Sequence, residues 1–147
     1  MGRQAKWAQR ADGPFISHFQ SLARNLSIAI SAAYTENIDG ITGPGDKLPP
    51  RNSVALIDRT GKVLHDFKKV HIAWSGIPDD TDCEGATGAG RAFYTSALDL
   101  GGGRGNISVC SLICFDREHP ESAALCAAGG AELVMHPTAC RMDMGES

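Results

Sequence analysis

The sequence predicts an α/β fold, and three patterns indicate this class. Residues 14–26 carry apolar side chains at three- and four-residue spacing, which is typical of an amphipathic helix. Residues 53–67 contain two short apolar stretches joined by a turn, which indicates a β-hairpin. Residues 107–136 read as a buried strand, a helix and another strand, and strands joined in this way are normally parallel.

Composition narrows the class of protein further. The chain has 147 residues, which suits one domain, with 42% hydrophobic and 21% charged residues. The net charge is -3 and the basic residues are scattered, so we expect no nucleic-acid partner. No apolar run approaches the length needed to span a bilayer, and the N-terminus lacks the apolar segment of a signal peptide. We therefore expect a soluble, cytoplasmic protein that does not bind membranes.

The N-terminal elements follow from periodicity. Pro14 suits the first turn of the helix at 14–26, and Asp12 is the expected cap. Residues 26–34 alternate between apolar and small or polar side chains, which predicts a strand. A loop rich in glycine and proline is expected at 39–50. The apolar face of the helix consists of Phe15, Phe19, Leu22 and Leu26.

The middle of the chain is predicted to be β-structure and loops. The hairpin consists of strands at 53–58 and 62–67. Residues 74–90 show no periodicity and are expected to form a loop. A further strand is predicted at 93–100, followed by a glycine-rich turn at 101–105.

The most informative region is a strand, turn, helix and strand in succession. Residues 107–113 are nearly all apolar or small, as expected of a central strand buried on both faces. The polar stretch 115–119 is turn-like, and Pro120 begins a helix that two glycines end after residue 128. The next strand is predicted at 132–136, parallel to the first.

The cysteines do not indicate a disulfide framework. Their number is odd, no pair has Cys-x-x-Cys spacing, and the chain shows no secretion signal. We expect at least three of the five to be small buried hydrophobic residues. The five are Cys83, Cys110, Cys114, Cys126 and Cys140.

Cys114 is the candidate nucleophile. It follows the buried strand and precedes the helix at Pro120, and ligands of open α/β sheets bind beyond the carboxyl ends of strands. A helix N-terminus nearby favours the thiolate, which is the reactive form. Position alone leaves a buried core cysteine as the commoner interpretation.

Two motifs then indicate a family. Residues 112–122 (LICFDREHPES) resemble the nucleophile segment of the nitrilase superfamily of carbon–nitrogen hydrolases, which shows an apolar strand, Cys, an aromatic residue, Asp, Arg, and Pro-Glu at a helix start. The hairpin from residue 52 and the stretch 67–72 (FKKVHI) resemble the family's lysine segment. The likeness extends over nearly the whole chain from Gly13 onward.

The resemblance implies roles for four residues. Cys114 would be the nucleophile and Lys69, not Lys68, the catalytic lysine. The backbone N–H of Phe115 would face the charge that develops on the substrate. Glu84 is the candidate for a second glutamate that positions the lysine and the substrate. No cofactor and no metal are implied.

The resemblance also implies an architecture, of which residues 1–147 would be a partial domain. The family forms a four-layer α-β-β-α sandwich and assembles as a homodimer or larger. The family's general-base glutamate precedes the helix at 14–26, but residues 1–12 contain no glutamate, so no residue is assigned to that role. Because C-terminal elements are also missing, we expect a fragment truncated at both ends that aggregates and does not turn over substrate.

The substrate class follows from the residues after the nucleophile. Phe115 and Asp116 are typical of the amidase and carbamoylase branches, whereas nitrilases tend to have Trp-Glu there. Members that bind a carboxylate often use two arginines, but here Arg117 is followed by Glu118. The resemblance therefore favours a small-molecule amide with a neutral or small acyl group; a nitrile or an N-carbamoyl substrate is the alternative.

Other interpretations stay open with less support. Residues 85–90 could form a phosphate loop but lack the Gly-Lys-Ser/Thr ending. A metal site at Cys110, Cys114 and His119 lacks a matching second pair. A cysteine–histidine dyad would need His71 or His119 at hydrogen-bond distance from Cys114. The chain could also be a non-catalytic remnant or a partner-binding protein.

Overall fold

The computed structural model describes residues 7–38, 48–73, 84 and 87–139. Within them the chain forms two three-stranded sheets, with strand orders β1-β2-β3 and β4-β5-β6. Most of the loops expected at 39–50 and 74–90, together with Cys83 and Cys140, lie outside the described residues.

The first sheet is antiparallel throughout and carries helix α2 (Pro14–Leu26) on one face. Ile16 and Ala23 of the helix are buried against this face of the sheet. The helix has the predicted bounds, but its N-cap is Gly13; Asp12, the expected cap, instead pairs with Arg10, 2.8 Å away. The strands are β1 (Ile30–Glu36), β2 (Arg51–Ile57) and β3 (Val63–Lys68).

The predicted strand at 26–34 begins later in the structure. Ser27 adopts a left-handed conformation with φ 54°, and its backbone N–H donates to the carbonyl of Arg24. This reversal ends the helix, so that the extended chain starts at Ile30. The alternating pattern correctly predicts a strand in this region, but the first residues of the predicted strand form the end of the helix.

The second sheet is mixed and contains the strand that leads to Cys114. Strand β4 (Thr95–Asp99) is antiparallel to β5 (Asn106–Ser111), which is parallel to β6 (Leu133–Met135). The prediction of a central strand followed by a parallel neighbour is confirmed within this sheet. Helix α3 (Pro120–Ala128) connects the two parallel strands and has the predicted bounds.

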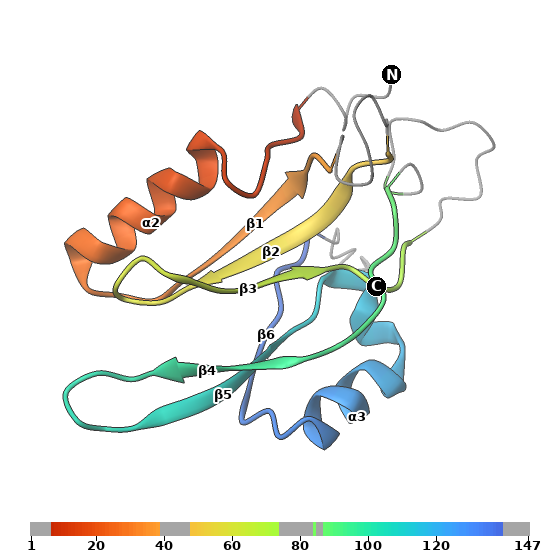
Figure 1. Ribbon diagram of the computed structural model, residues 1–147. Coiled ribbons are helices and arrows are strands. Elements are labelled where there is room, and N and C mark those ends of the chain that lie inside the picture. Colours follow the sequence, from red (N-terminus) through yellow and green to blue (C-terminus); the bar gives the residue numbers. More distant parts are fainter. Residues whose placement is uncertain (1–6, 39–47, 74–83, 85–86, 140–147) are drawn as a thin grey trace, which may run out of the picture.

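The elements pack in the order α2, first sheet, second sheet, α3 (Figure 1). Leu56 of β2 contacts Leu98 and Val109 of the second sheet, which makes an apolar layer between the sheets. On the outer side of the second sheet, Cys126 of α3 packs with Leu112 and Cys110.

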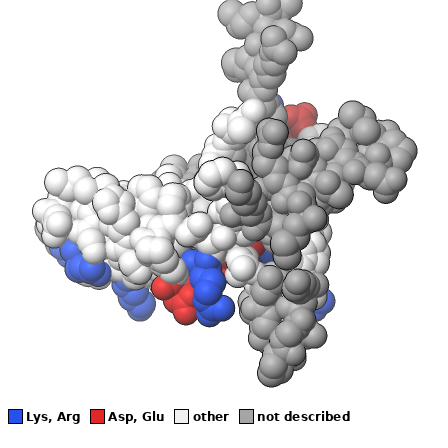
Figure 2. Space-filling view, turned by 90° about the horizontal axis from the view of Figure 1, so that it is seen from above, with Lys and Arg blue, Asp and Glu red and all other residues white. Residues whose placement is uncertain are grey.

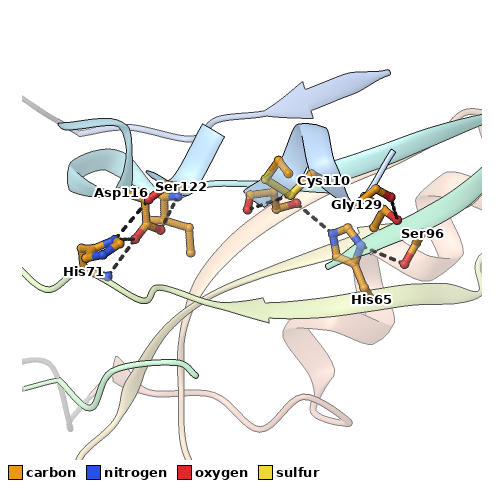
Figure 3. The surroundings of a disulfide bond; sticks show 11 residues. His65, His71, Ser96, Cys110, Asp116, Ser122 and Gly129 are labelled. Atoms are coloured by element: carbon orange, nitrogen blue, oxygen red, sulfur yellow. Dashed lines mark hydrogen bonds and ion pairs between the residues drawn. A yellow bond between two sulfur atoms is a disulfide. The ribbon is translucent and has the colours of Figure 1, made fainter. Parts of the chain in front are cut away.

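A disulfide between Cys110 and Cys126 corrects the sequence-based expectation (Figure 3). Cys110 lies on β5 and Cys126 on α3, and both are buried. Their Cα atoms are 5.8 Å apart, within the range that a disulfide spans. Sequence spacing gave no signal because the pairing depends on how the helix packs on the strand.

The described surface in Figure 2 bears charges of both signs. Lys and Arg side chains lie beside Asp and Glu side chains along one edge, next to a broad uncharged area. In the part of the chain that the structure describes, no helix combines the length and the apolar character that crossing a bilayer requires.

Candidate active site

Cys114 sits on a strained turn between strand β5 and helix α3. Its φ is 47°, in the left-handed region that residues with a side chain rarely occupy. The strand ends at Ser111, and a short 3₁₀-helix, η2 (Cys114–Glu118), begins at the cysteine. Strained strand-to-helix turns expose the nucleophile of α/β-hydrolases, and strained backbone of this kind clusters at functional sites.

A cavity of about 390 Å³ opens beside Cys114. Its lining contains both sequence-predicted groups Cys114 and Glu84, together with small or apolar residues. The cysteine, half-buried in the wall, can therefore contact a molecule bound there. The described lining residues are Ala33, Asn52, Glu84, Ile113, Cys114, Pro137, Thr138 and Ala139.

Lys69 reaches this site through Glu84. The lysine side chain is fully buried, and its ammonium contacts Oε1 of Glu84. Asn52 donates a hydrogen bond of 2.8 Å from Nδ2 to the same oxygen. The backbone N–H of Lys69 also donates to the carbonyl of Asn52 at 2.8 Å, so β2 fixes the segment after β3. A buried cation thus lies one contact away from the cavity that contains Cys114.

Asp116, two residues after the cysteine, is fully buried and joins two segments of the chain. Its Oδ1 accepts hydrogen bonds from the backbone N–H groups of Val70 (3.2 Å) and His71 (2.8 Å). Its Oδ2 accepts from the backbone N–H of Ile113 at 2.9 Å. The carboxylate therefore ties the residues that follow Lys69 to the turn that carries Cys114.

The two histidines considered for a dyad interact with each other. The rings of His71 and His119 are stacked with centroids 3.8 Å apart. Nδ1 of His71 lies 3.2 Å from Oδ1 of Asp116 and 3.3 Å from Oγ of Ser122 (Figure 3). Phe115 packs edge-on against His119, which places its ring beside this stack.

Three residues at the site were not identified from the sequence. The sequence predicts Asn52 only as the start of a hairpin, Asp116 only as typical of the amidase and carbamoylase branches, and His136 only as the last residue of a strand. Nε2 of His136 donates to the carbonyl of Cys114 at 3.1 Å. Only the position of Asp116 within the nucleophile motif gave a sequence signal; the other two contacts depend on packing between elements.

Comparisons with known proteins agree with this architecture. A variant of the amidase from Nesterenkonia sp. AN1, with the acetamide moiety of fluoroacetamide added covalently at its active site cysteine, superposes with a TM-score of 0.63 at 29% identity, over 88% of this chain and 42% of that one. A carbon-nitrogen hydrolase from Helicobacter pylori G27 matches with a TM-score of 0.68 at 22% identity, over 90% and 39% of the two chains. The fold is thus a mixed α/β fold that matches nitrilase-superfamily structures over part of their length.

The sequence comparisons assign the family. The model of the family described as "Carbon-nitrogen hydrolase" matches residues 2–147, and the chain belongs to this family. It is 32% identical over 133 residues to the N-carbamoylputrescine amidase of Oryza sativa subsp. japonica. That match covers 86% of this chain and 36% of the rice protein, so the chain spans well under half the length of this relative.

Proposed function

We propose that Cys114 is the nucleophile of a hydrolase that cleaves the carbon–nitrogen bond of a small neutral amide. The observation that carries the proposal is the shared cavity: Cys114 and Glu84 line it, and the ammonium of Lys69 contacts Glu84. A nucleophile, a buried cation and a carboxylate beside one small cavity fit attack on a polarised carbonyl.

The chemistry proceeds by acyl transfer. The Cys114 thiolate attacks the carbonyl carbon and forms a C–S bond, and negative charge collects on the substrate oxygen. Lys69 and the backbone N–H of Phe115 stabilise that charge; the first N–H groups of a helix have no acceptor within it, and Phe115 follows Cys114 at the start of η2. The C–N bond then breaks, the amine leaves with the proton that the Cys114 thiol released on forming the thiolate, and a thioester remains for water to hydrolyse.

The general base for that last step is not among the residues we assign. Among the described residues, Glu84 is the carboxylate that lines the cavity, and its Oε1 is already bound by Lys69 and Asn52. We therefore propose that Glu84 orients the lysine and the substrate. Acylation of Cys114 is the step that this chain can be tested for directly.

The lining of the cavity supports a neutral, small acyl group. Its described residues contribute small or apolar side chains, one amide and one carboxylate. Arg117, the residue that could attract an anionic substrate, pairs with Glu118 at 2.8 Å and is about half exposed. A carboxylate on the substrate would therefore gain little from this arginine and would be repelled by Glu84.

An N-carbamoyl compound is the second candidate substrate. The similarity to the rice N-carbamoylputrescine amidase favours it, since a carbamoyl group is itself a small neutral acyl group. Assays of a longer form of the protein with a simple amide, an N-carbamoyl amine and a nitrile discriminate between the branches. Turnover of the nitrile alone would overturn the amidase assignment.

The proposal includes an assembly and a location. From the family we expect this chain to be part of a four-layer sandwich that pairs with a second copy in the cytoplasm. Analytical ultracentrifugation of the longer form tests the expected dimer or larger assembly.

Covalent labelling tests the nucleophile. Fluoroacetamide is itself a small neutral amide, and a thiolate displaces its fluoride to form a thioether. We expect it to modify Cys114 before any other free cysteine of the native chain. Peptide mass spectrometry identifies the modified residue, and Cys114→Ser should remove the fast phase because a hydroxyl is a far weaker nucleophile without a strong base. First labelling of Cys83 or Cys140 would show that another cysteine is the reactive one, since Cys110 and Cys126 are joined in a disulfide.

A further inference from the structure

We propose that Asp116 and His136 are positioning residues that clamp the Cys114 turn from two sides. This inference rests on the proposed function, because it concerns how the nucleophile is held. We assign neither side chain a contact with the substrate. Each binds the backbone that carries Cys114 or the segment that carries Lys69.

Asp116 forms the first side of the clamp. Both of its oxygens are used: Oδ2 holds the N–H of Ile113, just before the cysteine, and Oδ1 holds the N–H groups of Val70 and His71, just after the lysine. Hydrogen bonds to a buried carboxylate are strong, because the charge has no competing water. Asp116 therefore links the segment that follows Lys69 directly to the turn that carries Cys114; Figure 3 shows its contacts with His71.

His136 forms the second side, from the end of strand β6. Its Nε2 donates to the carbonyl of Cys114 at 3.1 Å, and the backbone N–H of Cys114 donates to the carbonyl of Pro137 at 3.0 Å. The peptide groups on both sides of the Cys114 side chain are thus bonded to the same stretch of chain. This fixes the direction in which the thiol and the following N–H of Phe115 point.

The clamp explains how an unfavourable backbone conformation persists. A cysteine with φ 47° would relax toward an ordinary strand or helix geometry if its peptide groups were unbound. Relaxation would turn the thiol and the Phe115 N–H away from each other. Loss of either clamp residue should therefore reduce attack on an amide-bearing electrophile more than attack on an electrophile without an amide.

Two thiol reagents make this measurable in the chain as it exists. Acrylamide carries an amide carbonyl, and methyl methanethiosulfonate does not. The rate ratio of the two reagents at Cys114, compared with the ratio in the urea-unfolded chain, measures the help that the native site gives to the amide. We expect Asp116→Asn and His136→Leu to lower this native enhancement by about tenfold or more, since small displacements of a reacting group cost up to about a hundredfold.

Matched variants separate positioning from stability. Asp58→Asn also removes a carboxylate that binds backbone N–H groups, those of Thr60 and Lys62, but far along the chain in the hairpin turn. It should keep the wild-type ratio. His136→Gln retains an N–H donor and should restore the ratio lost in His136→Leu. If Asp116→Asn does not fold, judged by circular dichroism, the His136 pair alone decides the test.

The outcomes of this experiment distinguish a failure of the clamp from a failure of the proposed function. A folded His136→Leu or Asp116→Asn protein with the wild-type ratio would overturn the clamp and leave the nucleophile assignment intact. A wild-type chain with no enhancement over its unfolded form would overturn the proposed function itself. Faster reaction with both reagents in the variants would mark Asp116 and His136 as merely structural, because loosening of the fold exposes the thiol to every electrophile alike.

Discussion

The ammonium of Lys69 is fully buried and contacts the carboxylate of Glu84, 15 residues further along the chain. Burying an isolated ammonium is costly, so the pairing accounts for how this lysine is tolerated inside the protein. Asn52 binds the same carboxylate oxygen, which leaves the pair with a defined orientation beside the cavity. Because Lys69 and Glu84 form an ion pair beside the cavity, substitution of either residue should change the reactivity of Cys114.

Replacing the lysine tests this ion pair. Lys69→Met keeps the apolar length of the side chain but removes the charge. Because an ammonium nearby favours the thiolate, alkylation of Cys114 by fluoroacetamide should slow by about tenfold, the effect of a thiol pKa raised by about one unit. Lys62→Met, at an exposed position in the hairpin, is the control and should react at the wild-type rate. Wild-type kinetics in folded Lys69→Met would remove the lysine from the site.

The strain at Cys114 predicts a gain in stability when the side chain is removed. Cys114→Gly should have a free energy of unfolding about 1 kcal/mol higher than Cys114→Ala, because glycine adopts φ 47° without steric cost. Ser27→Gly, at the other described left-handed residue with a side chain, should show a similar advantage over Ser27→Ala. Urea unfolding measures both; Ala32→Gly in strand β1 is the control and should be destabilising.

The buried ring of His65 predicts that the free energy of unfolding decreases in acid. The ring is buried between the sheets, with Nδ1 3.1 Å from Oγ of Ser96 and Nε2 2.8 Å from Oγ of Ser111, and burial lowers its pKa from 6.5 to about 4. The unfolded chain therefore takes up a proton at a higher pH than the folded one. The contribution of the neutral His65 ring to the free energy of unfolding is fully present above about pH 6.5. It is lost as the pH drops toward about 4.

The measurement is urea unfolding across that pH range. His65→Gln should flatten the dependence, because glutamine does not titrate. His18→Gln, at an exposed helix position, should leave it in place. An unchanged slope in folded His65→Gln would assign the acid sensitivity to other groups.

The disulfide predicts a dependence on reducing agents. Reduction of the Cys110–Cys126 bond should lower the free energy of unfolding by about 3 kcal/mol, the usual size for a bridge that closes a loop of this length. Thermal unfolding with and without dithiothreitol measures the difference. The Cys110→Ala/Cys126→Ala double variant should melt at one temperature under both conditions; a reductant effect that survives there would come from another cysteine.

The sequence predicted elements whose signals are local. Helices α2 and α3 have the expected bounds because a proline near the start of each and a change of periodicity or a glycine pair at its end lie within the element itself. The parallel pairing of β5 with β6 was predictable for the same reason, since a strand, a helix and a strand follow each other in the chain. The family motif also directed attention to the turn at Cys114.

Features that depend on packing were beyond the sequence. The Cys110–Cys126 bond requires the register of α3 on β5, which no spacing rule gives. Asp116 binds backbone groups 45 and 46 residues earlier in the chain, so its function as a link is invisible in a local pattern. Asp12 failed as a cap because an arginine two residues before it offers a charged donor.

The reactivity of the Cys114 thiol can also be used to follow the folding of the chain. Its geometry requires β6 and the segment after β3 to have docked, because Pro137 and Asp116 supply the bonds that hold it. An unfolded or partly assembled chain therefore carries only an ordinary thiol. During refolding, the moment at which Cys114 begins to discriminate between electrophiles would time the docking of these distant segments without any added dye or label.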